Sequence, residues 1–315
     1  MTLKASVANV IVKINIDKGF NNIINLIKNF SESKQGTLLT INITKSKNRS
    51  VKLSDDFNQL IIKGDDINNL SNPYNIIGLL QAIFRFVSIH SLKNNTLLLH
   101  ASASILSDKA FCFADDGINT GKSISSIECA FESKKYLGDE FCFLDLNTYN
   151  VFSYRFIPIH FRADTKSHFE KKHNFAFPKT EYQENNAGYF INPDNIFTVI
   201  DSHKLAAFVF PQFNNTNDKL ELLDPKNSKN CIGMTLASHT IKMMYPEYDR
   251  MNFVTNKDKK LVKSIDESIL EDTISLLSLE NSIDNIIKKV PCYRALMTSP
   301  CSIISLLNNV PIKSS

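Results

Sequence analysis

The sequence predicts an α/β fold, and the central stretch from residue 97 to 145 carries most of that prediction. Apolar runs at 97–99 and 110–114 are long enough for buried strands and too short for helices. From Ile124 to Phe131 the apolar residues fall instead at helical spacing. Strands and helices that follow one another in this way are typical of α/β domains.

The composition is that of a globular protein with a substantial core. A chain of 315 residues allows one large domain or two modest ones. Its hydrophobic content of 43% and charged content of 22% are ordinary for a soluble protein. The net charge of +4 is small and spread along the chain, so the sequence gives no reason to expect a nucleic-acid partner.

The six cysteines are scattered without a CxxC spacing, and several lie inside apolar runs, where cysteine acts as a small core residue. This pattern predicts neither a disulfide framework nor a metal site. Lys13 interrupts the short apolar patch near the start of the chain, which argues against a signal peptide. No apolar run approaches the length of a membrane span, so we expect a cytoplasmic protein without a membrane partner.

We expect two domains, an N-terminal α/β module over 1–70 and a larger domain over 71–315. Strand patterns in the module occur at 10–16, 38–43 and 60–63. A segment with helical spacing, 20–30, lies between the first two. The module has no catalytic cluster, so packing or substrate recognition is its expected role.

The larger domain begins with a helix over 72–87, whose wide apolar face is typical of a core helix. After residue 145 we expect strands at 150–162 and 205–210, helices at 234–245 and 265–287, and short elements at 292–297 and 303–307. The polar stretch 164–193 has no clear periodicity, so we expect a long loop there, either a mobile lid or a solvated insertion.

The loop before the central helix ends in Gly121, Lys122 and Ser123, which is the end of a phosphate-binding loop. Gly121 lets the backbone approach a phosphate closely, and the N–H groups of a helix start favour an anion. Lys122 can reach the β- and γ-phosphates, and the Ser123 hydroxyl can hold Mg²⁺. An ordinary turn and helix start is the alternative.

The earlier part of this loop departs from the usual pattern. Asp116 stands at the first loop position, where glycine is usual, and the neighbouring Gly117 can supply the flexibility. Asn119 tolerates a left-handed backbone. Together with Thr120, Gly117 and Asn119 complete the expected nucleotide-binding set. A carboxylate such as Asp116 repels a triphosphate unless it turns away or binds a metal ion.

An acidic pair, Asp139 and Glu140, follows the helix and opens an apolar run at 141–144 that is typical of a buried strand. Beside a phosphate-binding loop, one such carboxylate binds Mg²⁺ and another accepts the proton of the attacking hydroxyl. A solvated strand end is the alternative. Arg162 either contacts a phosphate or an acidic substrate group or is a surface arginine, and we expect His160 to be structural.

The segments LLHASAS (98–104), GKS (121–123) and LGDE (137–140) together resemble the core of the HPr kinase/phosphorylase-like proteins, which share a nucleotide-binding core with ATP-dependent phosphoenolpyruvate carboxykinase. VPCYRALMT at 290–298 looks like the closing strand of small HPr-kinase-like proteins found beside peptide-modifying enzymes. The glutamate-bearing signature of the bifunctional HPr enzyme is missing, because FIPIHFR at 156–162 has no carboxylate. The resemblance therefore does not imply HPr as the substrate, or the phosphorylase activity.

The resemblance implies an ATP- and Mg²⁺-dependent kinase that moves the γ-phosphate to a hydroxyl, either a serine of a protein or peptide or a small molecule. It implies that Asp139 accepts and donates the proton, that Glu140 assists with the metal, and that His100 orients Asp139 or contacts the phosphate. Two alternatives stay open: a non-catalytic descendant that binds a nucleotide or peptide, and a structural or assembly subunit that binds no nucleotide. A homo-oligomer is also left open.

Overall fold

The computed structural model describes residues 2–7, 10–20, 37–47, 50–54, 58–64, 83, 86–88, 90–91, 94–114, 121–152, 159–161, 163–177, 183–184, 188–214, 216–244 and 276–311. The chain groups into two compact units, each built from separate stretches. The first comprises Met1–Asn94, Tyr154–Asn195 and Ile241–Thr273, and the second comprises Asn95–Ser153, Ile196–Thr240 and Ile274–Ser315. The expected division into 1–70 and 71–315 stays a prediction.

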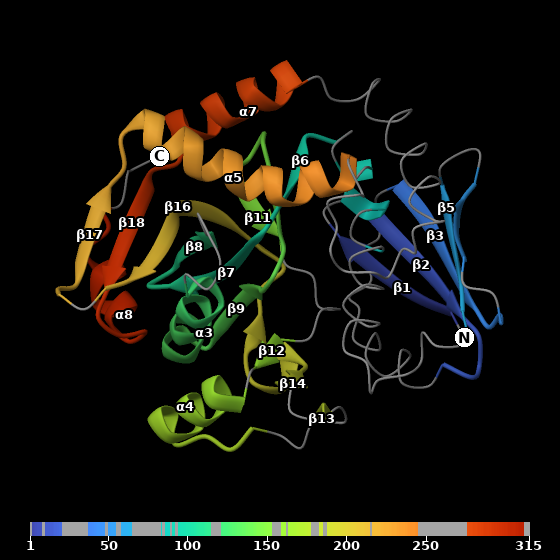
Figure 1. Ribbon diagram of the computed structural model, residues 1–315, viewed down its shortest axis with the longest axis horizontal. Coiled ribbons are helices and arrows are strands. Elements are labelled where there is room, and N and C mark those ends of the chain that lie inside the picture. The colour runs from blue at the N-terminus through green and yellow to red at the C-terminus, as the bar shows by residue number, and fades with distance from the viewer. Residues whose placement is uncertain are drawn as a thin grey trace. The chain divides into compact units, whose positions relative to one another are not determined.

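The first unit contains a mixed sheet, drawn in blue in Figure 1, with the strand order β1-β2-β3-β5-β4. Its strands are β1 (Thr2–Val7), β2 (Val10–Ile16), β3 (Thr37–Thr44), β4 (Ser50–Leu53) and β5 (Gln59–Lys63). The three central strands are parallel, and β1 and β4 are antiparallel edges. Along β2 every second residue is buried, because a strand places alternate side chains on one face of its sheet.

A smaller layer of the first unit consists of β12 (Ile159–Phe161), β14 (Gly188–Ile191), β13 (Gln183–Glu184) and α4 (Ala163–His173). The Phe161 ring centroid lies 5.9 Å from that of Phe169 and 4.8 Å from that of Phe177, and this aromatic cluster fixes the helix. The expectation of a loop throughout 164–193 is therefore wrong. The helix has one buried aromatic anchor and a Lys166–Glu170 ion pair instead of an apolar stripe, so its sequence shows no helical period.

The second unit contains a large mixed sheet with the order β15-β9-β7-β8-β16-β11-β10-β6, and β18 pairs with β16 and β17. Its strands are β6 (Thr96–Leu99), β7 (Ala101–Leu106), β8 (Lys109–Ala114), β9 (Lys135–Gly138), β10 (Cys142–Asp145), β11 (Asn150–Phe152), β15 (Thr198–Val199), β16 (Ser202–Phe213), β17 (Lys219–Leu222) and β18 (Cys292–Met297). The central strands β8, β16 and β18 are parallel to one another, whereas β7 forms an antiparallel hairpin with β8.

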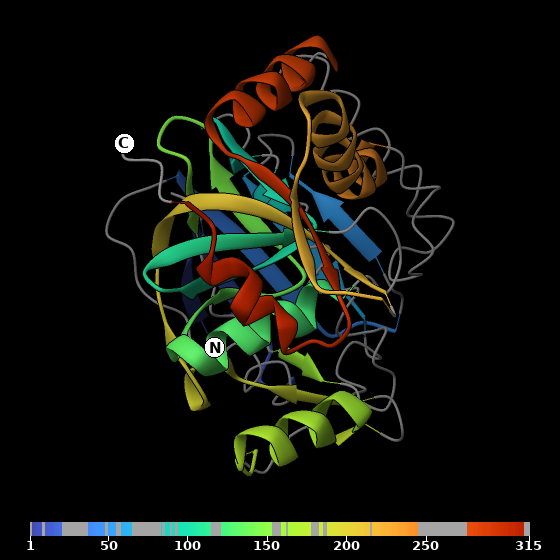
Figure 2. The same ribbon diagram turned by 90° about the vertical axis from the view of Figure 1, so that its left-hand side faces the viewer.

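Helices cover both faces of this sheet (Figures 1 and 2). Helices α3 (Lys122–Ser133) and α8 (Ser302–Asn308) lie side by side on one face, and α5 (Pro225–Met244) and α7 (Leu276–Lys289) lie on the other. The core under α3 and α8 includes Phe111, Val209, Met297 and Ile303. Burial on both faces explains why β8 and β16 read as continuous apolar runs and not as alternating ones.

Most of the strands and helices expected in the second unit are confirmed, with shifted ends. The helix expected at 234–245 begins earlier, at Pro225, and the one expected at 265–287 is described only from Leu276 to Lys289. The helix expected at 20–30 and most of the one at 72–87 lie outside the described residues. Within the described part of the chain, no helix is both long and apolar enough to span a bilayer.

Candidate functional site

The candidate site lies at the N-terminal end of α3, where Gly121 joins the helix with φ 96° and ψ 14°. The backbone conformation favours glycine, and a Cβ there would lie 2.7 Å from Cε2 of Phe213, so this ring would have to move. Gly121 has no side chain with which to cap the helix, and the first turn contains no acidic residue. The first backbone N–H groups and the positive end of the helix dipole therefore lack an anionic side chain of the same turn.

Lys122 and His100 meet in this place, although they are 22 residues apart in the sequence. Lys122 is only 9% exposed, and its Nζ lies 2.5 Å from Nε2 of His100. The same imidazole nitrogen lies 3.3 Å from a carboxylate oxygen of Glu140. Because an ammonium group can only donate, the contact with Lys122 requires His100 to accept at Nε2, and the contact with Glu140 then competes for that nitrogen.

A second chain of contacts joins Asp139 to Ser123 through Ser102. The Ser102 hydroxyl donates a hydrogen bond of 2.5 Å to Oδ1 of Asp139, and it lies 3.5 Å from the Ser123 hydroxyl. Ser102 is fully buried and Asp139 is 6% exposed. The structure therefore brings five predicted residues to one end of α3, namely His100, Lys122, Ser123, Asp139 and Glu140.

Ser102 was not among the residues predicted for the site. The sequence signal for it is weak, because β7 is buried along its whole length and has two serines, Ser102 and Ser104, among its apolar residues. A buried hydroxyl needs a hydrogen-bond partner, and here the partner is a carboxylate 37 residues further along the chain. A buried polar residue in a core strand therefore indicates a polar partner elsewhere in the fold.

The Cys142 thiol and the Tyr136 phenol near Asp139 are held in their neutral forms. Burial raises the pKa of the Cys142 thiol, neighbouring Cys112 and the Asp139 carboxylate raise it further, and Lys122 opposes them. The thiol donates a hydrogen bond of 3.2 Å to the carbonyl of Ala101. Burial and Asp139 likewise raise the pKa of Tyr136. Neither the thiol nor the phenol is ionised near neutral pH.

Five predicted positions cannot be compared with the structure. Asp116, Gly117, Asn119, Thr120 and Arg162 lie outside the described residues, so their roles in binding nucleotide or substrate stay predictions. His160 lies on β12 of the first unit, as its sequence context indicates, with only its backbone described.

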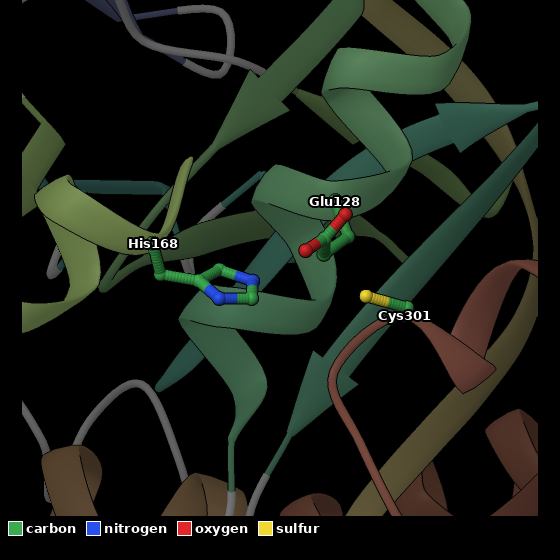
Figure 3. A group of neighbouring side chains, drawn as sticks. All are labelled: Glu128, His168 and Cys301. Carbon is green, nitrogen blue, oxygen red and sulfur yellow. The ribbon is translucent and has the colours of Figure 1, made fainter. Parts of the chain in front are cut away.

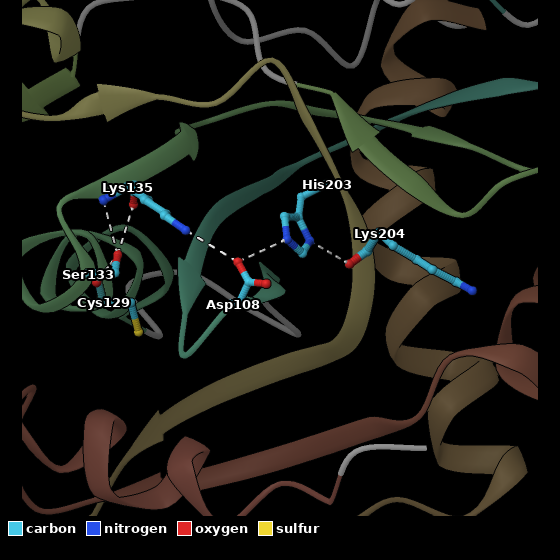
Figure 4. Close-up of polar contacts among 6 residues, drawn as sticks. All are labelled: Asp108, Cys129, Ser133, Lys135, His203 and Lys204. Carbon is cyan, nitrogen blue, oxygen red and sulfur yellow. Dashed lines mark hydrogen bonds and ion pairs between the residues drawn. The ribbon is translucent and has the colours of Figure 1, made fainter. Parts of the chain in front are cut away.

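Two other clusters of polar side chains occur in the described part of the second unit, and neither includes the buried residues of the candidate site. Figure 3 shows Glu128 on α3 and Cys301 before α8, whose ligand atoms lie within 4.8 Å of each other; the figure also draws His168, which belongs to α4 of the first unit. Two ligands are too few for a zinc site. Figure 4 shows Asp108 between Lys135 and His203, with contacts of 3.3 Å and 3.7 Å at the surface.

Comparison with known proteins gives no family for this chain. No protein-family model matches it, and no curated protein sequence matches it either.

Proposed function

We propose that this protein is an ATP- and Mg²⁺-dependent kinase with a phosphoenolpyruvate carboxykinase/HPr kinase-like nucleotide-binding core. The γ-phosphate would move to a hydroxyl, with a serine of a protein or peptide as the favoured acceptor. The observation that carries the proposal is that a buried lysine, Lys122, and a buried carboxylate, Asp139, both lie at the start of one helix, with the Ser102 and Ser123 hydroxyls between them.

The electrostatics of the helix start support an anionic ligand. A buried ammonium group loses hydration, and next to the positive end of a helix dipole it is destabilised further. His100, which accepts a hydrogen bond from Lys122, is one polar partner of that ammonium group. A phosphate bound at the first N–H groups of α3 would offset both the ammonium charge and the dipole.

The oxygen atoms near Lys122 suit a magnesium ion. Mg²⁺ prefers hydroxyl, carboxylate and water oxygens, and Ser123, Asp139 and Glu140 supply the first two kinds. Ser123 and Glu140 would hold the ion, and the bound ion would neutralise charge on the phosphates during transfer. Asp139, oriented by the hydrogen bond from Ser102, would take the proton from the acceptor hydroxyl.

The first experiment is calorimetry of ATP binding with and without Mg²⁺, on the wild type and on Lys122→Met. We expect micromolar affinity for the wild type, about −8 kcal/mol, and loss of most of it in the variant. Lys135→Ala is the matched control, because this lysine is 42% exposed at the opposite end of α3. If the wild type binds no nucleotide, the proposal is wrong. Tight binding without phosphate transfer to any serine peptide would favour the non-catalytic descendant.

A further inference from the structure

Strands β16 and β18 extend past the carboxyl end of β8, at the end of the sheet where the candidate site lies. Val209 of β16 pairs with Phe113, one residue before β8 ends. β16 continues in register with β18 as far as Phe213, which pairs with Met297. At about 3.3 Å per residue, Phe213 lies roughly 10 Å beyond the last residue of β8. β8, β16 and β18 are parallel to one another, and in open α/β sheets ligands bind at the carboxyl ends of such strands, which is this end of the sheet.

The side chain of Phe213 is in direct contact with the helix start. Its ring packs on the face of Gly121 where any other residue would have a side chain, with Cε2 2.7 Å from the position of a Cβ. Phe213 is nevertheless 43% exposed. A large apolar side chain is thus held next to the residue that precedes Lys122, with much of its surface accessible.

We infer that Phe213 is the stacking platform for the base of the nucleotide, an inference that rests on the proposed kinase function. The contact with Gly121 holds the ring at a fixed position relative to the phosphate site. A fixed ring suits a group that is covalently joined to the phosphates, as a nucleobase is, better than a separate acceptor molecule. Bases stack on aromatic side chains whatever their sequence identity, because every base has a π face.

The test separates recognition of the base from recognition of the phosphates. Binding of Mg-ATP and of Mg-tripolyphosphate, which has the phosphates but no base, is measured by calorimetry for the wild type and Phe213→Ala. We expect Phe213→Ala to weaken Mg-ATP binding about tenfold or more, and to leave tripolyphosphate binding unchanged. Phe213→Tyr keeps an aromatic face and should bind Mg-ATP nearly as well as the wild type.

Leu222→Ala is the matched control for loss of an exposed apolar side chain, because Leu222 is 68% exposed on β17. Equal losses for both ligands in Phe213→Ala would show that the ring only supports the helix start, and would overturn the inference. Unchanged Mg-ATP binding would overturn it as well, while the kinase proposal would stand. If the wild type binds neither ligand, the kinase proposal itself fails.

Discussion

The two ends of helix α3 carry the same kinds of side chain in opposite surroundings. At the N-terminal end, Lys122 and Asp139 are buried, with exposures of 9% and 6%. At the C-terminal end, Lys135 pairs with Asp108 across 3.3 Å, but their side chains are 42% and 80% exposed. Figure 4 shows the exposed arrangement, with Asp108 at the turn of the β7–β8 hairpin.

The difference favours the N-terminal end of α3 as the place where a ligand would bind. An exposed ion pair contributes between zero and about 1 kcal/mol to stability, and it needs no further explanation than holding a hairpin turn. Burying an ammonium and a carboxylate costs several kcal/mol per ion unless their partners compensate. Lys122 and Asp139 are buried beside a helix start that favours an anion, which makes them candidates for function.

The largest expected effect separates the two carboxylates. Asp139→Asn should reduce phosphate transfer about 10²- to 10⁴-fold, because the amide cannot accept the proton of the acceptor hydroxyl. ATP binding should change little, since Lys122 and the helix start are intact. Asp108→Asn, at the exposed end, should transfer phosphate at the wild-type rate. The measurement is the rate of phosphate transfer from labelled ATP to a serine peptide, together with calorimetry.

Two results would contradict this reading of the acidic pair. If Asp139→Asn transfers phosphate as fast as the wild type, Asp139 is not the base. If Asp139→Asn loses ATP binding together with turnover, its main role is to hold the metal and not to move the proton.

The second effect concerns the hydrogen bond from Ser102 to Asp139. Ser102→Ala leaves the buried carboxylate without that donor and should destabilise the fold by about 1–3 kcal/mol. It should also lower kcat more than it changes KM, because the orientation of the base is lost. Urea unfolding and steady-state kinetics measure the two effects.

Ser104→Ala is the control for this variant. Ser104 is equally buried on the same strand, but its hydroxyl donates to the carbonyl of Lys135, which also accepts from Ser133. Ser104→Ala should therefore cost less stability, and its kcat should match that of the wild type. A comparable fall of kcat in both variants would mean that packing of β7, and not the orientation of Asp139, limits the reaction.

Some of these elements could be predicted from the sequence. The runs at 97–99 and 110–114 and the helix after Gly121 are strongly patterned, and the structure confirms all three, as β6, β8 and α3. Local patterns of this kind record which face of an element is buried, so one sequence is enough to read them. Local patterns did not connect His100, Lys122 and Asp139. The resemblance to the HPr kinase/phosphorylase-like proteins placed these three residues in one predicted site.

What the sequence does not contain is the pairing of distant residues. Ser102 meets Asp139 across 37 residues, and no local period predicts which buried hydroxyl lies opposite which carboxylate. The position of β16 between β8 and β18 could not be predicted either, because many strand orders fit the same local patterns. Helix α4 escaped prediction for another reason, since a single buried side chain, Phe169, anchors a polar helix.

A third, smaller effect tests the helix start itself. Gly121→Ala should destabilise the fold by about 1–2 kcal/mol, because alanine is strained at φ 96°. The contact with Phe213 adds to this, and Phe213→Ala in the same chain should restore only the steric part. Gly233→Ala is the control, because a Cβ there meets nothing within 4 Å on α5, and it should be neutral or stabilising. A stable Gly121→Ala variant in urea unfolding would contradict the geometry of this turn.

The smallest effect is expected at the exposed end of α3. The hydrogen bond and charge of Lys135 hold the pKa of Asp108 below its usual value, with a smaller contribution from His203. A carboxyl whose pKa falls on folding adds stability above its unfolded pKa, near 3.9, and that stability is lost as the pH falls through the folded value. Asp108→Asn should therefore unfold only slightly earlier than the wild type at pH 7, and the two should coincide near pH 2.

Thermal unfolding at the two pH values measures this small difference. At 80% exposure the side chain of Asp108 is almost fully solvated, so water screens its interaction with Lys135. If Asp108→Asn destabilised the fold as much as Ser102→Ala, solvent exposure would not distinguish the two ends of α3. The helix start and Lys122 would then be the remaining support for chemistry at the buried end of α3.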